Sequence, residues 1–112
     1  MLKSEISDGI IICSFRHSDK LNSVNSDKFK REIGEYLATP GTMLILDLYK
    51  INFIDSSGFG ALLFAHRLAG NNSCQLRFCN IRPAVMKSFK ILQLDKVFVI
   101  RKTPEECLDT FS

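Results

Sequence analysis

One stretch near the middle of the chain constrains the fold most: an apolar run, a short polar junction and a second apolar run. Residues 43–48 are apolar except for Asp47, and apolar and polar residues do not alternate in them, which is typical of a strand covered on both faces of a parallel sheet. The Ala- and Leu-rich run that ends at Ala69 predicts a helix. Between them, residues 55–60 are Asp-Ser-Ser-Gly-Phe-Gly, the composition of a helix N-terminus that lies close to another group.

The segments on either side of this stretch predict alternating strands and helices. Further strands are expected at residues 2–6, 10–15, 75–79 and 96–100, the first two forming a hairpin, and further helices at residues 26–38, from Pro83 onward and from Pro104 to about Phe111. The fold class is therefore α/β. We expect a single domain over residues 1–112, with a mixed sheet of roughly four to five strands and about four helices.

Two of the expected helices have informative details. The polar face of the helix at residues 26–38 has opposite charges four residues apart at Lys28–Glu32 and Arg31–Glu35. We therefore expect this face to be exposed, with ion pairs between side chains of the same helix. The last helix has a capping signal, because Thr103 can serve as N-cap and Pro104 suits the first helical position.

Composition excludes several classes of function. The net charge is only +3 and the basic residues are dispersed, which argues against nucleic-acid binding. No apolar run can span a bilayer and no signal peptide opens the chain, so we expect a cytoplasmic protein without membrane insertion. The four cysteines are Cys13, Cys74, Cys79 and Cys107, and no two of them form a C-x-x-C pair. We therefore expect them to be reduced thiols, and we expect the protein to bind no metal and no cofactor.

The helix after Gly58 is expected to have a core face and a solvent face. A helical projection groups the core residues as Ala61, Phe64, Ala65 and Leu68. Phe59 and Leu63 fall on the opposite side, with His66 and Arg67. This apolar pair predicts a contact surface one turn from Ser56, although a covering loop would also account for it.

The two serines have a structural and a functional interpretation. Ser56 or Ser57 can cap the helix by accepting a backbone N–H bond. One cap is sufficient, so the other hydroxyl is left available. Gly58 and Gly60 reduce steric bulk, which allows a partner to approach closely. A helix N-terminus also favours added negative charge, so the fold would tolerate a phosphate there.

The junction resembles a known family. Residues 55–60 are similar to the Asp-Ser-[Ser/Thr]-Gly-Leu-Gly motif of anti-sigma factor antagonists, whose domain is called STAS. Residues 44–48 and 53–55 resemble the strand and lead-in of that family, 80–85 its later strand-to-helix junction, and 94–98 the entry to its last strand. The first forty residues match only loosely.

The resemblance implies a phosphorylation switch in transcription regulation. The unphosphorylated protein would bind an anti-sigma factor that is also a serine kinase, phosphorylation would release it, and a serine phosphatase would reset the switch. The implied acceptor is Ser56, with Ser57 as the alternative. The resemblance implies these partner-binding residues: Asp55, Ser57, Gly58, Phe59, Leu63 and Asn22. Phe59 replaces the usual leucine, and Asn22 stands where an acid most often falls.

Two other functions compete with the switch. An enzyme with a serine nucleophile would need His17 or His66 as base, but the stretch is not Gly-x-Ser-x-Gly and no motif supplies an oxyanion hole, so we expect no enzyme activity. The alternative is a non-switching STAS domain that acts as the soluble subunit of a lipid transporter or as a sensing or scaffold module.

Overall fold

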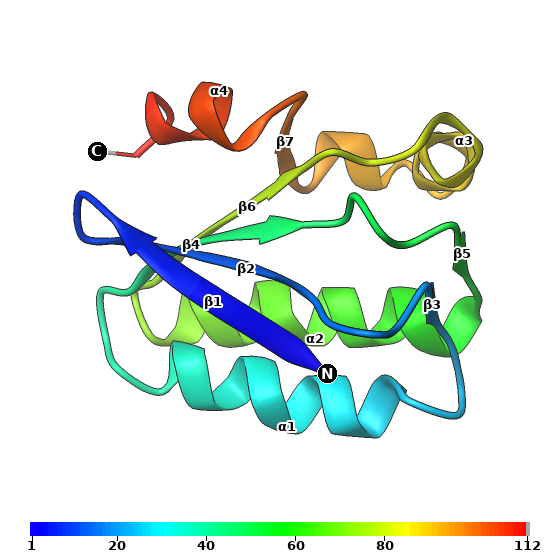
Figure 1. Ribbon diagram of the computed structural model, residues 1–112, viewed down its shortest axis with the longest axis horizontal. Helices are drawn as coiled ribbons and strands as arrows, with labels where there is room; N and C mark the ends of the chain where they lie inside the picture. Colours follow the sequence, from blue (N-terminus) through cyan, green and yellow to red (C-terminus); the bar gives the residue numbers. More distant parts are fainter. Residues whose placement is uncertain (112) are drawn as a thin grey trace.

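A five-stranded mixed sheet forms the centre of the molecule in the computed structural model, which describes residues 1–111 (Figure 1). In spatial order its strands are β1 (Leu2–Ser7), β2 (Ile10–Phe15), β4 (Met43–Asp47), β6 (Gln75–Cys79) and β7 (Val99–Arg101). β1 and β2 are antiparallel, and the other neighbours are parallel. The predicted hairpin and mixed sheet are therefore confirmed.

Helices cover both faces of the sheet (Figure 1). α1 (Ser26–Leu37) and α2 (Ser56–Asn71) lie below it in this view, whereas α3 (Pro83–Ile91), the short 3-10 helix η1 (Leu94–Lys96) and α4 (Pro104–Leu108) lie above. β4 lies in the middle, and its Leu44, Ile45 and Leu46 are fully buried. Apolar and polar residues do not alternate in this strand because both faces of the sheet are covered here.

A second, two-stranded sheet lies at one end of the molecule and was not expected from the sequence. β3 (Lys20–Leu21) pairs in parallel with β5 (Phe53–Ile54). Leu21 and Ile54 are paired and buried, whereas Lys20 and Phe53 are paired and exposed. Each strand has only two residues, so no periodicity reveals it. This pairing brings the loop before α1 to the start of α2.

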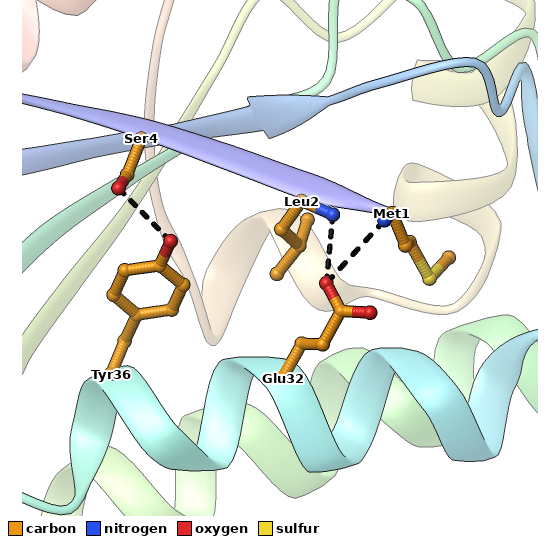
Figure 2. A network of polar contacts seen from close by, with 5 residues as sticks. All are labelled: Met1, Leu2, Ser4, Glu32 and Tyr36. Atoms are coloured by element: carbon orange, nitrogen blue, oxygen red, sulfur yellow. Dashed lines mark hydrogen bonds and ion pairs between the residues drawn. The ribbon is translucent and has the colours of Figure 1, made fainter.

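The edge strand β1 is tied to α1 by polar contacts (Figure 2). Glu32 Oε1 lies 3.6 Å from the α-amino group of Met1 and accepts the Leu2 N–H at 2.8 Å. The Tyr36 hydroxyl donates to Ser4 Oγ at 2.9 Å. The expected pairing of Glu32 with Lys28 is therefore wrong, because the start of β1 supplies more favourable partners for this carboxylate.

The core face of α2 differs from the helical projection. Its buried residues are Gly58, Phe59, Ala61, Leu62, Ala65 and Ala69. Phe59 is only 7% exposed, and its ring packs edge-on against Phe89 of α3 at 5.2 Å between centroids. Leu63 is half-buried and packs against the core. The expected outward position of Phe59 and Leu63 is wrong, because α2 contacts α1 and α3 as well as the sheet, and the projection considered only one covered side.

Two boundaries near the C-terminal end also differ from expectation. β7 begins at Val99, because the chain first forms η1 where a strand was expected from residue 96. α4 ends at Leu108, short of the expected Phe111. The four cysteines are free thiols, as predicted, and all four are buried. Within residues 1–111, no helix is long and apolar enough to cross a membrane.

Candidate functional site

The start of α2 is capped by a carboxylate and not by a serine. Asp55 is the N-cap residue, and its Oδ1 accepts the Gly58 N–H at 2.9 Å. Ser56 is therefore the first residue inside the helix and Ser57 the second. The expectation that one serine hydroxyl caps the helix is wrong, because Asp55 already satisfies the amide that a capping serine would bind.

The cap also fastens α2 to the loop that precedes α1. The second oxygen of Asp55, Oδ2, accepts the Ser23 N–H at 3.1 Å. The Asp55 N–H donates to the Leu21 carbonyl at 3.1 Å. A single carboxylate thus joins two segments that lie about thirty residues apart in sequence. The position of the Ser56 backbone follows from these bonds, since they fix the residue immediately before it.

Gly58 is required by the close approach of this loop. A Cβ at this position would collide with the Leu21 carbonyl oxygen and would lie 2.7 Å from Ile54 Cγ2. Gly60, two residues later in the same helix, has nothing within 4 Å of a Cβ position. The first glycine therefore serves the packing of the fold, and the second leaves open space on the helix surface.

The hydroxyl of Ser56 is accessible and unused. Ser56 is exposed and Ser57 is half-buried. Within residues 1–111, neither hydroxyl takes part in a hydrogen bond. The positive end of the α2 dipole lies at these residues, which favours an anionic group attached there. The arrangement can accept a covalent modification without breaking a bond that holds the fold.

Asn22 shapes the loop beside the site. Its Oδ1 accepts the Val24 N–H at 3.0 Å, and its carbonyl accepts the Ser26 N–H at 2.8 Å. These bonds turn the chain from β3 into α1. The loop lines a shallow pocket of about 240 Å³, whose residues are Ser18, Asp19, Lys20, Asn22, Val24 and Asn25. Together with the bond from Ser23 to Asp55, these contacts place the Asn22 loop at the start of α2.

Two exposed apolar side chains lie next to residues of the site and were not among the predicted contact residues. Val24 is 90% exposed and follows the residue that bonds Asp55. Phe53 is 51% exposed and lies two residues before the cap. The signal for Val24 was an isolated apolar residue in a polar loop. The exposure of Phe53 could be recognised only from the β3–β5 pairing, which directs the Ile54 side chain inward and the Phe53 side chain outward.

The histidines and thiols of the described chain form no hydrogen bond with Ser56 or Ser57. The His66 ring packs against Phe98, with 5.3 Å between centroids. Burial raises the pKa of the Cys13 thiol to about 12, which keeps it protonated and unreactive at neutral pH. A hydrogen bond with Cys107, together with burial, raises the pKa of the Cys79 thiol. Within residues 1–111, no cluster of His, Cys, Asp and Glu could hold a metal ion.

Comparisons with known proteins place the chain in a family. The STAS domain model matches residues 1–107. BtrV of Bordetella bronchiseptica, provisionally described as an anti-sigma factor antagonist, is 22% identical over 104 residues, which cover 93% of this chain and 88% of BtrV. The structure of an anti-sigma factor antagonist domain protein from Planctomyces limnophilus superposes with a TM-score of 0.87 at 14% identity, covering 97% of this chain and 96% of that one.

A further solved relative is the Bacillus cell fate determinant SpoIIAA in its phosphorylated form. It has a TM-score of 0.66 and 19% identity, and the match covers 98% of both chains. The fold of the present chain is thus shared with regulators of this kind over nearly its whole length. This chain belongs to the STAS domain family, and its relatives include anti-sigma factor antagonists.

Proposed function

We propose that this protein is an anti-sigma factor antagonist whose binding to its partner is switched by phosphorylation of Ser56. The observation that carries the proposal is the exposed Ser56 hydroxyl, which the fold does not use because Asp55 caps α2. The partner would be an anti-sigma factor that is also a serine kinase, and a serine phosphatase would reverse the modification. A relative with the same fold, SpoIIAA, has been solved in phosphorylated and unphosphorylated forms, which supports this assignment.

The proposed docking surface is centred on Ser56. Val24 and Phe53 supply apolar contacts on either side of it. Asp55 and Asn22 hold the backbone that presents the hydroxyl, through the bonds described above. Phe59 takes no part in this surface, because its ring is buried against α3.

The remaining expected contact residues have supporting positions. Ser57 is half-buried beside the acceptor, and Gly58 allows the loop to approach. Leu63 is half-buried one turn further along α2 and would contribute only its exposed edge.

The loss of binding free energy on phosphorylation of Ser56 can be calculated from the repulsion between charges. A phosphoserine adds about −1.5 to −2 charges at neutral pH. Against a partner carboxylate at ~5 Å, an effective dielectric constant of ~20 gives a repulsion of roughly 3 kcal/mol per charge pair. Each 1.4 kcal/mol corresponds to about a tenfold change in affinity, so a single such pair is sufficient to release a complex.

The first experiment asks whether Ser56 is the acceptor. The protein is incubated with ATP and a candidate serine kinase from its own organism, and the intact mass and the modified peptide are measured. We expect one phosphate on the wild type and on Ser57→Ala, and none on Ser56→Ala. Phosphate that persists in Ser56→Ala would contradict the assignment. Absence of phosphate with every kinase tested, together with stable association with transporter subunits, would favour the non-switching alternative.

The second experiment asks whether charge at Ser56 controls binding. We expect Ser56→Asp to weaken the partner complex by at least about tenfold in titration calorimetry, because it adds one negative charge to the docking surface. Its thermal stability should be at least that of Ser56→Ala, since the hydroxyl makes no bond within the fold and the start of α2 favours negative charge. Equal affinities of the two variants would contradict a charge-based switch.

A further inference from the structure

The edge strand β1 has the features of a surface that pairs with another strand. β1 ends the five-stranded sheet, so only one of its sides is paired, and it lies at the front of the molecule in Figure 1. Its middle residues, Lys3 to Ile6, are exposed, and Ile6 is 74% exposed. It contains no proline and pairs with β2 without a bulge. Edge strands are usually shortened, bulged or covered, because their free backbone groups attract other chains.

The opposite edge of the sheet is protected in the usual way. β7 has three residues, half the length of β1. It ends in Arg101, and Lys102 follows directly. The end of β7 has only positive charge, whereas β1 has one residue of each sign at Lys3 and Glu5. The two edges therefore differ in their capacity for pairing with a second copy.

The side to which each residue of β1 directs its N–H and C=O groups decides which registers are possible with a second strand. The Met1 carbonyl accepts the Arg16 N–H at 2.7 Å, so Met1 faces β2. The Leu2 N–H bonds Glu32 instead, so Leu2 faces away from β2. Since this direction alternates along an antiparallel strand, Ser4 and Ile6 also direct their N–H and C=O groups to the free edge. A second strand must pair with these even-numbered residues, through Ser4, Ile6 and the carbonyl of Leu2, because Glu32 already holds the Leu2 N–H.

We propose that β1 pairs antiparallel with β1 of a second copy of this chain, about a two-fold axis at Ser4. In this register Ser4 lies opposite Ser4 of the second copy, and Lys3 lies opposite its Glu5. Lys3 and Glu5 form no ion pair with residues 1–111 of their own chain, so both charges are available. The two sheets would join into one continuous sheet with closed symmetry.

Charge selects this register over its neighbours. A shift by one pair in either direction places Lys3 opposite Lys3, or Glu5 opposite Glu5, of the second copy. Like charges directly opposite each other destabilise a strand pair, and opposite charges stabilise it. Only the register centred on Ser4 pairs both charges with the opposite sign. The sequence of β1 is therefore complementary to itself in one alignment.

The apolar residues of β1 support the same alignment. Ile6 lies opposite Leu2 of the second copy in the Ser4-centred register, on the face of the sheet that carries α1. Leu2 is half-buried and lines a hollow of about 500 Å³ with Glu32, Glu35 and Tyr36 of α1. Ile6 of the second copy would lie against this hollow, which removes from water a side chain that is 74% exposed in the single chain.

The test is the mass in solution by sedimentation equilibrium over about a hundredfold range of concentration. The wild type is expected to rise from 12.7 kDa toward twice this mass. Ser4→Pro removes the N–H at the two-fold axis while leaving the bonds to β2 intact, so it should remain a monomer. Ser4→Ala is the matched control: it loses the Tyr36 bond but keeps the N–H, and it should dimerise like the wild type.

Charge variants test the register independently of any folding defect in Ser4→Pro. Lys3→Glu and Glu5→Lys should each weaken the dimer by at least about tenfold, because each places like charges opposite one another. An equal mixture of the two should dimerise again, because the mixed pair restores opposite charges. A wild type that stays monomeric, a dimer unaffected by Ser4→Pro, or a mixture that fails to restore pairing would each overturn the proposal.

Discussion

The start of α2 and the start of α4 use hydroxyl side chains in opposite ways. In α4, Thr103 is the N-cap: its Oγ1 accepts the Glu106 N–H at 3.1 Å and lies 3.4 Å from Glu106 Oε2. In α2, Asp55 takes the capping position, and the hydroxyl of Ser56 makes no bond within residues 1–111. The fold thus uses the Thr103 hydroxyl as a cap, whereas it does not use the Ser56 hydroxyl.

The difference comes from one residue and from what surrounds it. A carboxylate has two oxygens, so Asp55 can cap α2 and bind Ser23 of the neighbouring loop at the same time. Thr103 caps a helix of five residues without joining it to a second loop. The hydroxyl of Ser56 therefore remains unbonded because another side chain, Asp55, performs the capping.

The largest expected effect tests the close packing that holds the α2 start in place. Gly58→Ala should lower the free energy of unfolding by about 3 kcal/mol, because its Cβ would collide with the Leu21 carbonyl and force the loop away. Gly60→Ala is the matched control in the same helix. Its Cβ meets open space, so it should raise stability by up to about 1 kcal/mol. Urea unfolding measures both, and equal effects would contradict the packing argument.

A smaller effect is expected from the cap itself. Asp55→Ala should lower the free energy of unfolding by about 1–2 kcal/mol, because it removes the acceptor of the Gly58 and Ser23 N–H groups. Asp55→Asn keeps one side-chain oxygen and should retain a large part of this stability. Thermal unfolding of the two variants beside the wild type is the measurement. If Asp55→Ala lowered the free energy of unfolding by only about 0.3 kcal/mol, water or a serine hydroxyl would have replaced the carboxylate as the cap.

Much of this arrangement could be predicted from the sequence. The apolar strand predicted at residues 43–48, the hairpin and the N-cap at Thr103 have strong local signals. The structure confirms all three, with the strand ending at Asp47. The order of strand, polar junction and helix also located the candidate site. These features depend on short-range pattern and capping chemistry, which a single sequence contains.

Three of the errors, at β3–β5, Phe59 and Glu32, share a cause, which is contact between distant segments. The β3–β5 pairing joins segments about thirty residues apart, and it decides that Phe53 is outward. α3 covers Phe59, so that ring is buried although the helical projection placed it on the solvent face. Glu32 binds the start of β1 and not the neighbouring Lys28. A projection of one helix includes none of these partners.

The smallest expected effect is the most direct test of the two helix starts. Thr103→Ala should lower the free energy of unfolding by about 1 kcal/mol, since it removes a cap from a helix whose Cys107 is fully buried. Ser56→Ala should change it by less than about 0.5 kcal/mol, as for a surface residue without partners. Both variants remove a hydroxyl near a helix start, so the comparison isolates whether the fold uses it. If Ser56→Ala costs as much as Thr103→Ala in urea unfolding, the serine is structural and the basis for assigning it as the phosphate acceptor is lost.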